Sequence, residues 1–117
     1  MRYVDGFVLA VPRRKLDAYR RMAQKAGKIW REHGALEFRE CVGDDLKVKM
    51  GAAFPRMVKA KRGENVLFSY IVFKSRAHRD KVNEKVMKDP RMNEMPEEMP
   101  FDVKRMTYGG FRVLVDL

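Results

Sequence analysis

The chain has 117 residues, of which 45% are hydrophobic and 36% are charged, a balance typical of a folded domain rather than a disordered chain. The length fits one domain covering residues 1–117, and no apolar run reaches the roughly 20 residues that a membrane span needs. The net charge is +10, but no RNP, helix-turn-helix, KH or zinc-finger pattern accompanies it, so we do not expect nucleic acid as a partner. The single cysteine, Cys41, excludes an intramolecular disulfide and fits a reducing compartment, so we expect a cytoplasmic protein without membrane contact.

The first third of the chain predicts a strand, a long helix and a second strand. Residues 2–11, RYVDGFVLAV, are rich in β-branched and aromatic residues and stop at a proline, which is typical of a strand. The helix face that follows is traced by apolar residues spaced three or four apart: Leu16, Tyr19, Ala23, Ala26, Trp30 and His33. Gly34 predicts the helix end, because glycine readily adopts the backbone conformation that follows a last helical turn. Residues 35–42 alternate between apolar and polar positions, which predicts a half-buried strand with Glu37 and Arg39 on one side and Phe38 on the other.

The remainder predicts a basic connection, a strand, a helix and a final strand. Residues 46–62 carry six basic side chains and no acidic one, and we expect a long loop there. Residues 65–74 are strongly β-forming, and Ser75 is a suitable N-cap for a second helix that ends at Asp89-Pro90. A segment rich in Met and Pro, with one short helical turn, then leads to a strand over residues 104–117. Gly109-Gly110 within that strand indicates either a bulge or a close approach of neighbouring atoms.

This order of elements predicts an α+β fold. The order β-α-β-β-α-β is that of the ferredoxin-like arrangement, an antiparallel sheet with two helices on one face. In residues 3–11 and 66–73 both alternating faces are mostly apolar. Two helices can cover only one face of the sheet, so we expect the other face to pack against the same face of a second copy. The sequence therefore predicts a homodimer packed sheet to sheet.

Four stretches also carry a resemblance to a known family. They are YVDGFVLAVP, LDAYRRMAQKAGKIWREHGALEFRECVGDD, FSYIVFKSRAHRDKVNEKVMKDPRM and MPFDVKRMTYGGF. Through them the chain resembles the YbaA-like bacterial family of unknown function, in the dimeric α/β-barrel superfamily. The resemblance implies a ferredoxin-like domain that dimerises into an α/β barrel, and it implies no particular activity. More distant members of the superfamily include cofactor-free monooxygenases, lactone isomerases and haem-handling enzymes, and this analogy suggests a cofactor-independent oxygenase or isomerase.

The densest group of reactive residues, WREHGALEFRECVGDD, does not predict a metal site. An extended strand after His33 places Asp44 roughly 30 Å away, whereas zinc ligands lie about 2 Å from the ion. We expect neither a metal nor a cofactor. His33 has two interpretations: it caps the helix, where a positive charge is favourable, or it lies at the mouth of a pocket and moves a proton as a catalytic group.

The sequence leaves two function hypotheses open. In the first, a small, partly apolar organic molecule binds between sheet and helices, in a pocket lined by Trp30, Arg39, Tyr70 and Tyr108. The charged residues on the strands also have a purely structural interpretation. Asp5 could form an ion pair with Arg39, or Glu37 with Arg112, across the sheet or between two copies. In the second hypothesis, a binding module without chemistry contacts an anionic partner such as RNA through Lys47, Lys49, Arg56, Lys59, Lys61 and Arg62. This basic segment could also pair with the acidic residues 92–100 of its own or a neighbouring chain.

Overall fold

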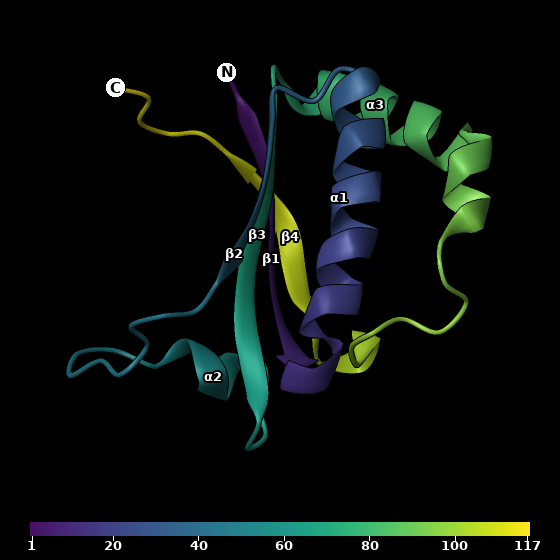
Figure 1. Ribbon diagram of the computed structural model, residues 1–117. Helices are drawn as coiled ribbons and strands as arrows, with labels where there is room; N and C mark the ends of the chain where they lie inside the picture. The colour runs from purple at the N-terminus through teal and green to yellow at the C-terminus, as the bar shows by residue number, and fades with distance from the viewer.

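A computed structural model describes residues 1–117 and contains one four-stranded antiparallel sheet (Figure 1). The strands are β1 (Tyr3–Pro12), β2 (Glu37–Val42), β3 (Glu64–Phe73) and β4 (Thr107–Arg112), and their order across the sheet is β2-β3-β1-β4. The two central strands pair along their whole length, from Tyr3 opposite Phe73 to Pro12 opposite Glu64. The predicted α+β class and the four strands are confirmed, although β4 is shorter than expected. The edge strand β2 is exposed from Arg39 to Val42, more than the half-buried strand that its alternation predicts.

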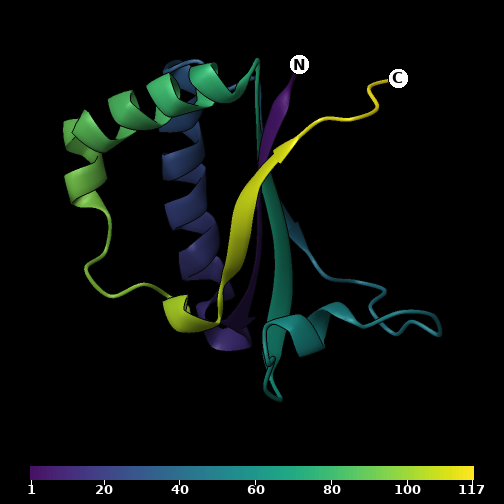
Figure 2. The same ribbon diagram turned by 180° about the vertical axis from the view of Figure 1, so that it is seen from behind.

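Two long helices cover the same face of this sheet (Figures 1 and 2). The first, α1 (Leu16–Glu32), follows a single 3-10 turn, η1 (Arg13–Lys15), and the second is α3 (Arg76–Lys88). Gly34 has a φ of +118° and donates its N–H to the Arg31 carbonyl, which closes α1 as expected. The Ser75 hydroxyl accepts from the His78 N–H at 3.1 Å, so the predicted N-cap of α3 is confirmed.

The main core lies between these helices and the sheet. Its fully buried side chains come from the helix-facing positions of the central strands and from α3: Leu9, Val11, Leu67, Phe73, Val82 and Val86. Fully burying one such aliphatic or aromatic side chain stabilises the fold by about 1.5–3 kcal/mol. This core fixes α1 against the sheet and so sets the distance between the helix and the strand residues that face it.

A third helix lies on the opposite face of the sheet and was not predicted. The basic segment was expected to be a loop, but it contains a one-turn helix, α2 (Phe54–Met57), whose first turn is favoured by Pro55. The Phe54 ring packs edge-on against Phe68 of β3 with the ring centroids 6.2 Å apart. Val58, directly after this turn, is fully buried against Val8, Ala10 and Val66. This packing covers one end of the second face.

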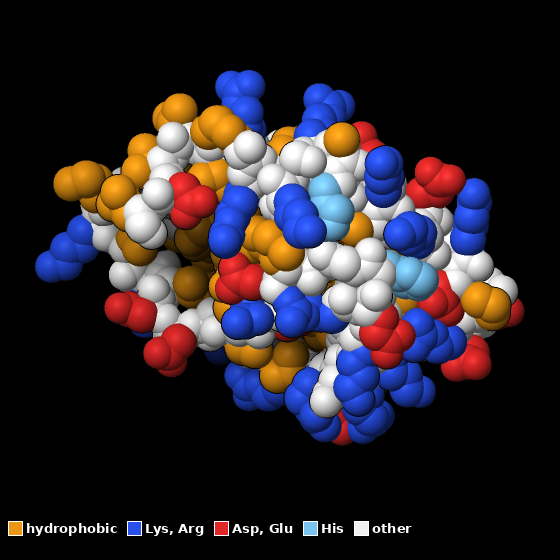
Figure 3. Space-filling view, turned by 90° about the horizontal axis from the view of Figure 1, so that it is seen from above, with side chains coloured by type: hydrophobic (Ala, Val, Ile, Leu, Met, Phe, Trp, Pro, Cys, Tyr) orange, Lys and Arg blue, Asp and Glu red, His pale blue; other side chains and the backbone are white.

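The rest of the second face remains apolar and uncovered. Phe68 is 45% exposed and Phe111, on β4, is 64% exposed. Figure 3 shows hydrophobic side chains gathered around a hollow on the side of the sheet where α2 lies. A single chain therefore leaves this apolar face exposed, and it is the face through which the expected homodimer would pack.

The segment between α3 and β4 contains two short turns rather than one: η2 (Pro90–Glu94) and η3 (Val103–Arg105). The pairing of β1 with β4 runs without interruption through Gly109 and Gly110, so the bulge is excluded. The close approach is confirmed, because a Cβ at Gly110 would collide with the Tyr3 side chain. None of the helices has the length and apolar character that crossing a bilayer would require.

Candidate functional site

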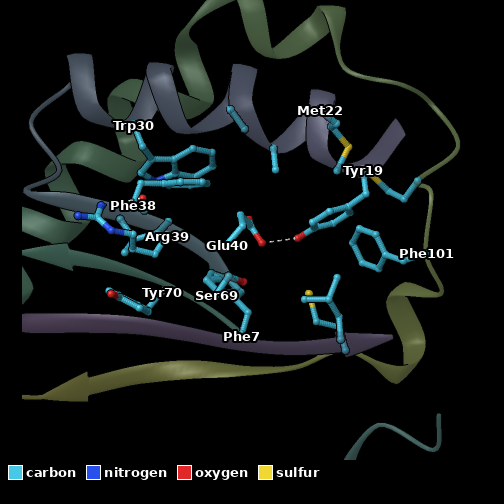
Figure 4. A pocket seen from close by; sticks show the side chains of 16 residues that line it. Phe7, Tyr19, Met22, Trp30, Phe38, Arg39, Glu40, Ser69, Tyr70 and Phe101 are labelled. Atoms are coloured by element: carbon cyan, nitrogen blue, oxygen red, sulfur yellow. Dashed lines mark hydrogen bonds between the residues drawn. The ribbon is translucent and has the colours of Figure 1, made fainter. Parts of the chain in front are cut away.

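An apolar cavity of about 210 Å³ lies between α1 and the sheet. Most of its wall is hydrophobic, with aromatic rings from α1, β1, β2 and the segment before β4: Phe7, Tyr19, Trp30, Phe38 and Phe101 (Figure 4). Met99 and Met106 close the end nearest to that segment. An apolar cavity of roughly 150 Å³ in another protein holds a benzene molecule, so the space here is sufficient for one substituted ring.

The polar groups of the cavity come from three different elements and lie close together in its wall. The Tyr19 hydroxyl on α1 donates a hydrogen bond of 2.8 Å to the Glu40 carboxylate on β2 (Figure 4). Glu40 faces the helix because it alternates along β2 with Arg39 and Cys41, which face the other way. Ser69 is opposite Glu40 in the neighbouring strand β3, is buried, and also lines the cavity. The result is one carboxyl and two hydroxyl groups on an otherwise apolar wall.

The surroundings of Glu40 favour its protonated form. Burial among apolar groups raises the pKa of Glu40, and hydrogen bonds from Tyr19 and Ser69 reduce this rise without cancelling it. Burial, and next the charge of Glu40, raises the pKa of Tyr19, so its hydroxyl remains a donor over the whole physiological range. Glu40 forms no ion pair with Lys or Arg, in contrast to the other shifted glutamates of the chain.

Glu40 is also accessible from outside the cavity. The residue keeps part of its surface exposed at the edge of the sheet, and it borders a second, open groove between α1 and the edge strand β2, together with Gln24 and Lys28. A carboxyl that is surrounded by apolar groups and still reachable is suited to accept and return a proton. The arrangement therefore provides a general acid–base group at the entrance of a ring-sized apolar space.

A second polar network holds Trp30 in the cavity wall. The Trp30 indole N–H donates to the Asn83 side-chain oxygen on α3 at 3.0 Å. Beside it, the Arg79 guanidinium lies 3.3 Å from the Asp5 carboxylate, whose pKa is raised by burial and lowered by that arginine. The suggested pairing of Asp5 with Arg39 is wrong within one chain, because Asp5 faces the helices and Arg39 faces the opposite side of the sheet.

Only some of the residues that were expected to line a pocket lie at this cavity. Trp30 lines the cavity, and Arg39 and Tyr70 border it, although strand alternation directs both of these side chains to the second face. Figure 4 accordingly shows the Arg39 guanidinium pointing away from the Tyr19–Glu40 hydrogen bond. Tyr108 does not line the cavity: it is 70% exposed on the edge strand β4 and stacks on Phe7 with the ring centroids 5.8 Å apart.

Charged residues on the two edge strands do not pair with each other. Glu37 lies 3.7 Å from Arg39 on its own strand, β2. Arg112 belongs to β4, at the other edge of the sheet. The suggested ion pair between Glu37 and Arg112 is therefore wrong within one chain.

His33 lies outside the cavity. It occupies the C-cap of α1, and its Nε2 is 2.8 Å from the Asp89 carboxylate at the end of α3. Hydrogen bonds from Arg91 and His33 hold the pKa of Asp89 far below its usual value. Of the two interpretations of His33, the cap describes its contacts, and His33 does not lie at the mouth of this cavity. The structure contains no group of three or more His, Cys, Asp or Glu side chains placed to hold a metal ion.

The basic segment does not pair with the acidic segment of its own chain. Residues 46–62 lie on the α2 side of the sheet, whereas residues 92–100 lie beyond α1 and α3 on the other side (Figure 1). None of the six predicted anion-binding side chains forms an ion pair. Glu64 instead accepts two hydrogen bonds from Arg105, at 2.8 and 2.7 Å, which link the start of β3 to η3.

Glu40 is the functional candidate that the sequence interpretation missed. Its position was nevertheless visible in the alternation of β2, because Glu40 stands between Phe38 and Val42 on the apolar side of that strand. Ser69 stands in the same way between Leu67 and Ile71 on β3. Polar residues at positions that periodicity assigns to the core were thus the useful indication.

This chain is similar to proteins that are described as uncharacterized. The uncharacterized protein YbaA of Escherichia coli strain K12 is 51% identical over 116 residues, covering 99% of each chain, and the YbaA proteins of Escherichia coli O157:H7 and Shigella flexneri match equally well. Among solved structures, the de novo designed protein Foldit4 aligns with 95% of this chain and 94% of its own, at 11% identity and a TM-score of 0.45. A family model described as "Protein of unknown function (DUF1428)" matches residues 2–103. The chain therefore belongs to the DUF1428 family, together with YbaA.

Proposed function

We propose that this protein binds a small, mostly apolar molecule with one ring in the cavity and that Glu40 transfers a proton on it. One observation carries the proposal: the Glu40 carboxyl has a raised pKa and is paired with hydroxyl groups rather than with a cation, at the entrance of an apolar space. A structural carboxylate would be matched by a positive charge, as Glu64 is by Arg105. A catalytic base needs a pKa closer to neutrality, which this environment favours.

Isomerisation of an unsaturated carbonyl compound is the reaction that these groups fit best. Glu40 removes a proton from the carbon between the carbonyl and the C=C bond, the double bond moves into conjugation, and the same carboxyl returns the proton at the far carbon. The Ser69 or Tyr19 hydroxyl donates a hydrogen bond to the carbonyl oxygen while negative charge develops on it. Every bond broken is balanced by one formed and no oxidant is consumed. For this reason the acid–base groups favour an isomerase over the oxygenase suggested by the superfamily resemblance.

The reaction can be tested with 3-cyclohexen-1-one, whose conjugated product has a strong ultraviolet absorption band that the unconjugated substrate lacks. Glu40→Gln should lower the turnover by at least about 10²-fold, the usual contribution of a positioned acid–base group. The only tryptophan of the chain, Trp30, lines the cavity, so quenching of its fluorescence reports ligand binding separately from chemistry. The Gln variant should still bind the ketone.

His33→Ala is the matched control, because His33 lies outside the cavity and was the group first expected to move the proton. Unchanged turnover in Glu40→Gln would refute the role of Glu40. Loss of turnover in His33→Ala alone would return the role to His33. Absence of fluorescence quenching by any cyclic ketone would remove the cavity as a binding site.

We also infer that the domain is a cytoplasmic, ferredoxin-like homodimer of the α/β-barrel type. The element order, the strand order β2-β3-β1-β4 and the placement of α1 and α3 on one face support the ferredoxin-like arrangement. The exposed Phe68 and Phe111 on the second face support its pairing with a second copy. Light scattering should give twice the 13.8 kDa of one chain.

A pair of substitutions locates the interface. Phe111→Asp should yield monomers if the second face is the contact. Met87→Asp on α3 replaces a side chain of nearly equal exposure, 62% against 64%, on the other side of the molecule and should leave the dimer intact. A wild-type monomer at micromolar concentration would contradict the dimer.

A further inference from the structure

A basic groove lies at the end of the sheet where β1 leads into α1 and where β3 begins. It is lined by residues 12–14 of one connection and residues 61–64 of the other. The Arg13 N–H donates to the Gly63 carbonyl at 2.9 Å, so a backbone hydrogen bond holds the two connections together. Both segments lie at the lower end of the sheet in Figure 1. The side chains of the groove are therefore carried by two adjoining, mutually anchored turns.

The groove carries four positive side chains that are not engaged in ion pairs. Arg13, Arg14, Lys61 and Arg62 are all exposed, and none of them forms an ion pair. The single carboxylate of the groove, Glu64, is occupied by two hydrogen bonds from Arg105. Like charges held together on adjoining turns repel one another, so an anion that binds all four would relieve this repulsion.

The backbone of the same turn adds uncharged donors. The N–H of Lys61 is satisfied by the Glu64 side chain, and the N–H of Glu64 by the Lys61 carbonyl. Between them, the N–H groups of Arg62 and Gly63 donate no hydrogen bond within the molecule. Gly63 has a φ of +82°, which glycine adopts readily as the third residue of a tight turn closed by the Glu64–Lys61 hydrogen bond, so the two free N–H groups belong to the two central residues of that turn.

We propose that this groove binds a small molecule with two or more linked phosphate groups. Three of the four basic residues are arginines, whose planar guanidinium groups form paired hydrogen bonds with phosphate oxygens. Linked phosphates carry enough charge to match all four side chains, which a single carboxylate does not. The groove and the cavity share no lining residue, so this proposal does not depend on the one made for Glu40.

The test is isothermal titration with inorganic pyrophosphate at a fixed, moderate salt concentration. Replacing Arg13 and Arg62 together by Gln should weaken binding by at least about tenfold, or about 1.4 kcal/mol, because two of the four charges and their paired hydrogen bonds to phosphate are lost. The control replaces Lys47 and Lys49 by Gln, which removes the same charge from a part of the basic segment that does not line the groove. This control should bind pyrophosphate almost as wild type does. Both variants change exposed side chains, and circular dichroism should show an unchanged fold.

Three results would overturn the proposal. The first is an absence of pyrophosphate binding to the wild-type protein. The second is equal weakening in both double variants, which would mean that the total charge matters and the groove does not. The third is an oligoribonucleotide that binds more tightly than pyrophosphate, with a steep salt dependence and a loss in the Lys47 and Lys49 variant, which would assign segment 46–62 to nucleic acid instead.

Discussion

Two glutamates on the same sheet have opposite environments, and their comparison separates structure from chemistry. Glu64, at the start of β3, accepts two hydrogen bonds from Arg105, and this lowers the pKa of Glu64 to about 2. Glu40, on β2, is hydrogen-bonded to Tyr19 and surrounded by apolar side chains, and burial raises the pKa of Glu40. One carboxyl is held in its charged form and the other is biased toward its neutral form.

The difference lies in the partner rather than in the residue type. A guanidinium gives Glu64 two strong, directional hydrogen bonds, so Glu64 remains charged at neutral and mildly acidic pH. Hydroxyl groups supply hydrogen bonds without charge, so they orient Glu40 but do not cancel the rise that burial causes in its pKa. A search for a reactive carboxyl should therefore begin where no cation accompanies it.

Removing Arg105, the cation that is paired with Glu64, should produce the largest loss of stability. Arg105→Ala leaves a nearly buried carboxylate unpaired and also frees Asp102 on η3. We expect a loss of about 2 kcal/mol in the free energy of unfolding, between the values for exposed and for buried ion pairs. This corresponds to a decrease of roughly 8 °C in Tm for a domain of this size. Thermal unfolding at neutral pH measures it, and Arg112→Ala, an arginine without an ion pair, is the control.

The stability difference between the wild type and Arg105→Ala should depend on pH, in a direction that follows from the pKa of Glu64. The pKa of Glu64 is about 2 in the folded state against an ordinary value of 4.5, so its pairing contributes stability above pH 4.5. That contribution is lost as the pH falls from 4.5 toward 2, and the difference between the wild type and Arg105→Ala should shrink over this window. A difference that stays constant down to pH 2 would mean that Arg105 stabilises by packing alone.

Removing the Tyr19 hydroxyl, which is hydrogen-bonded to Glu40, should lower the stability by a smaller amount. Tyr19→Phe keeps the edge-on contact with Phe101, whose ring centroid is 5.7 Å away, and deletes only the hydrogen bond. We expect a loss of about 1 kcal/mol, the usual contribution of one hydrogen bond. The pKa of Glu40 should rise further, which a carboxyl-carbon NMR titration detects. Ser69→Ala should shift the same resonance in the same direction, and a fall in either variant would contradict the assigned hydrogen bonds.

Local sequence patterns were sufficient for most of the fold. A high content of β-branched and aromatic residues located β1 and β3 almost to the residue, and Ser75 and Gly34 marked helix ends through rules that involve only a few neighbouring residues. The helix α2 was missed because a single turn has little stability of its own. It packs through Phe54 against Phe68, a contact between residues 14 positions apart that no local pattern contains.

The candidate site was harder to predict because it depends on which strands are neighbours. Tyr108 has the character of a pocket residue, but β4 is an edge strand and its ring lies outside the cavity. His33 finds its partner, Asp89, 56 residues further along the chain. Glu40 was overlooked in favour of the neighbouring Glu37 and Arg39, although only Glu40 occupies the apolar side of β2.

Removing the charge of Glu40 should have the smallest effect on stability and the opposite sign to that of Arg105→Ala. Because the folded pKa of Glu40 is raised, its folding contribution is fully present below its ordinary value of 4.5 and is lost as the pH rises through the folded pKa. Glu40→Gln keeps an acceptor for Tyr19 and carries no charge, so at neutral pH it should be more stable than the wild type. The gain should be only about 0.5 kcal/mol, since solvent reaches this side chain and screens its charge.

Denaturant unfolding at neutral pH and at pH 4 measures the difference, which should vanish at the lower pH because the wild-type carboxyl is then largely protonated. A variant less stable than the wild type at neutral pH would mean that the charge of Glu40 is stabilised in the fold, and Glu40 would then be a structural carboxylate like Glu64.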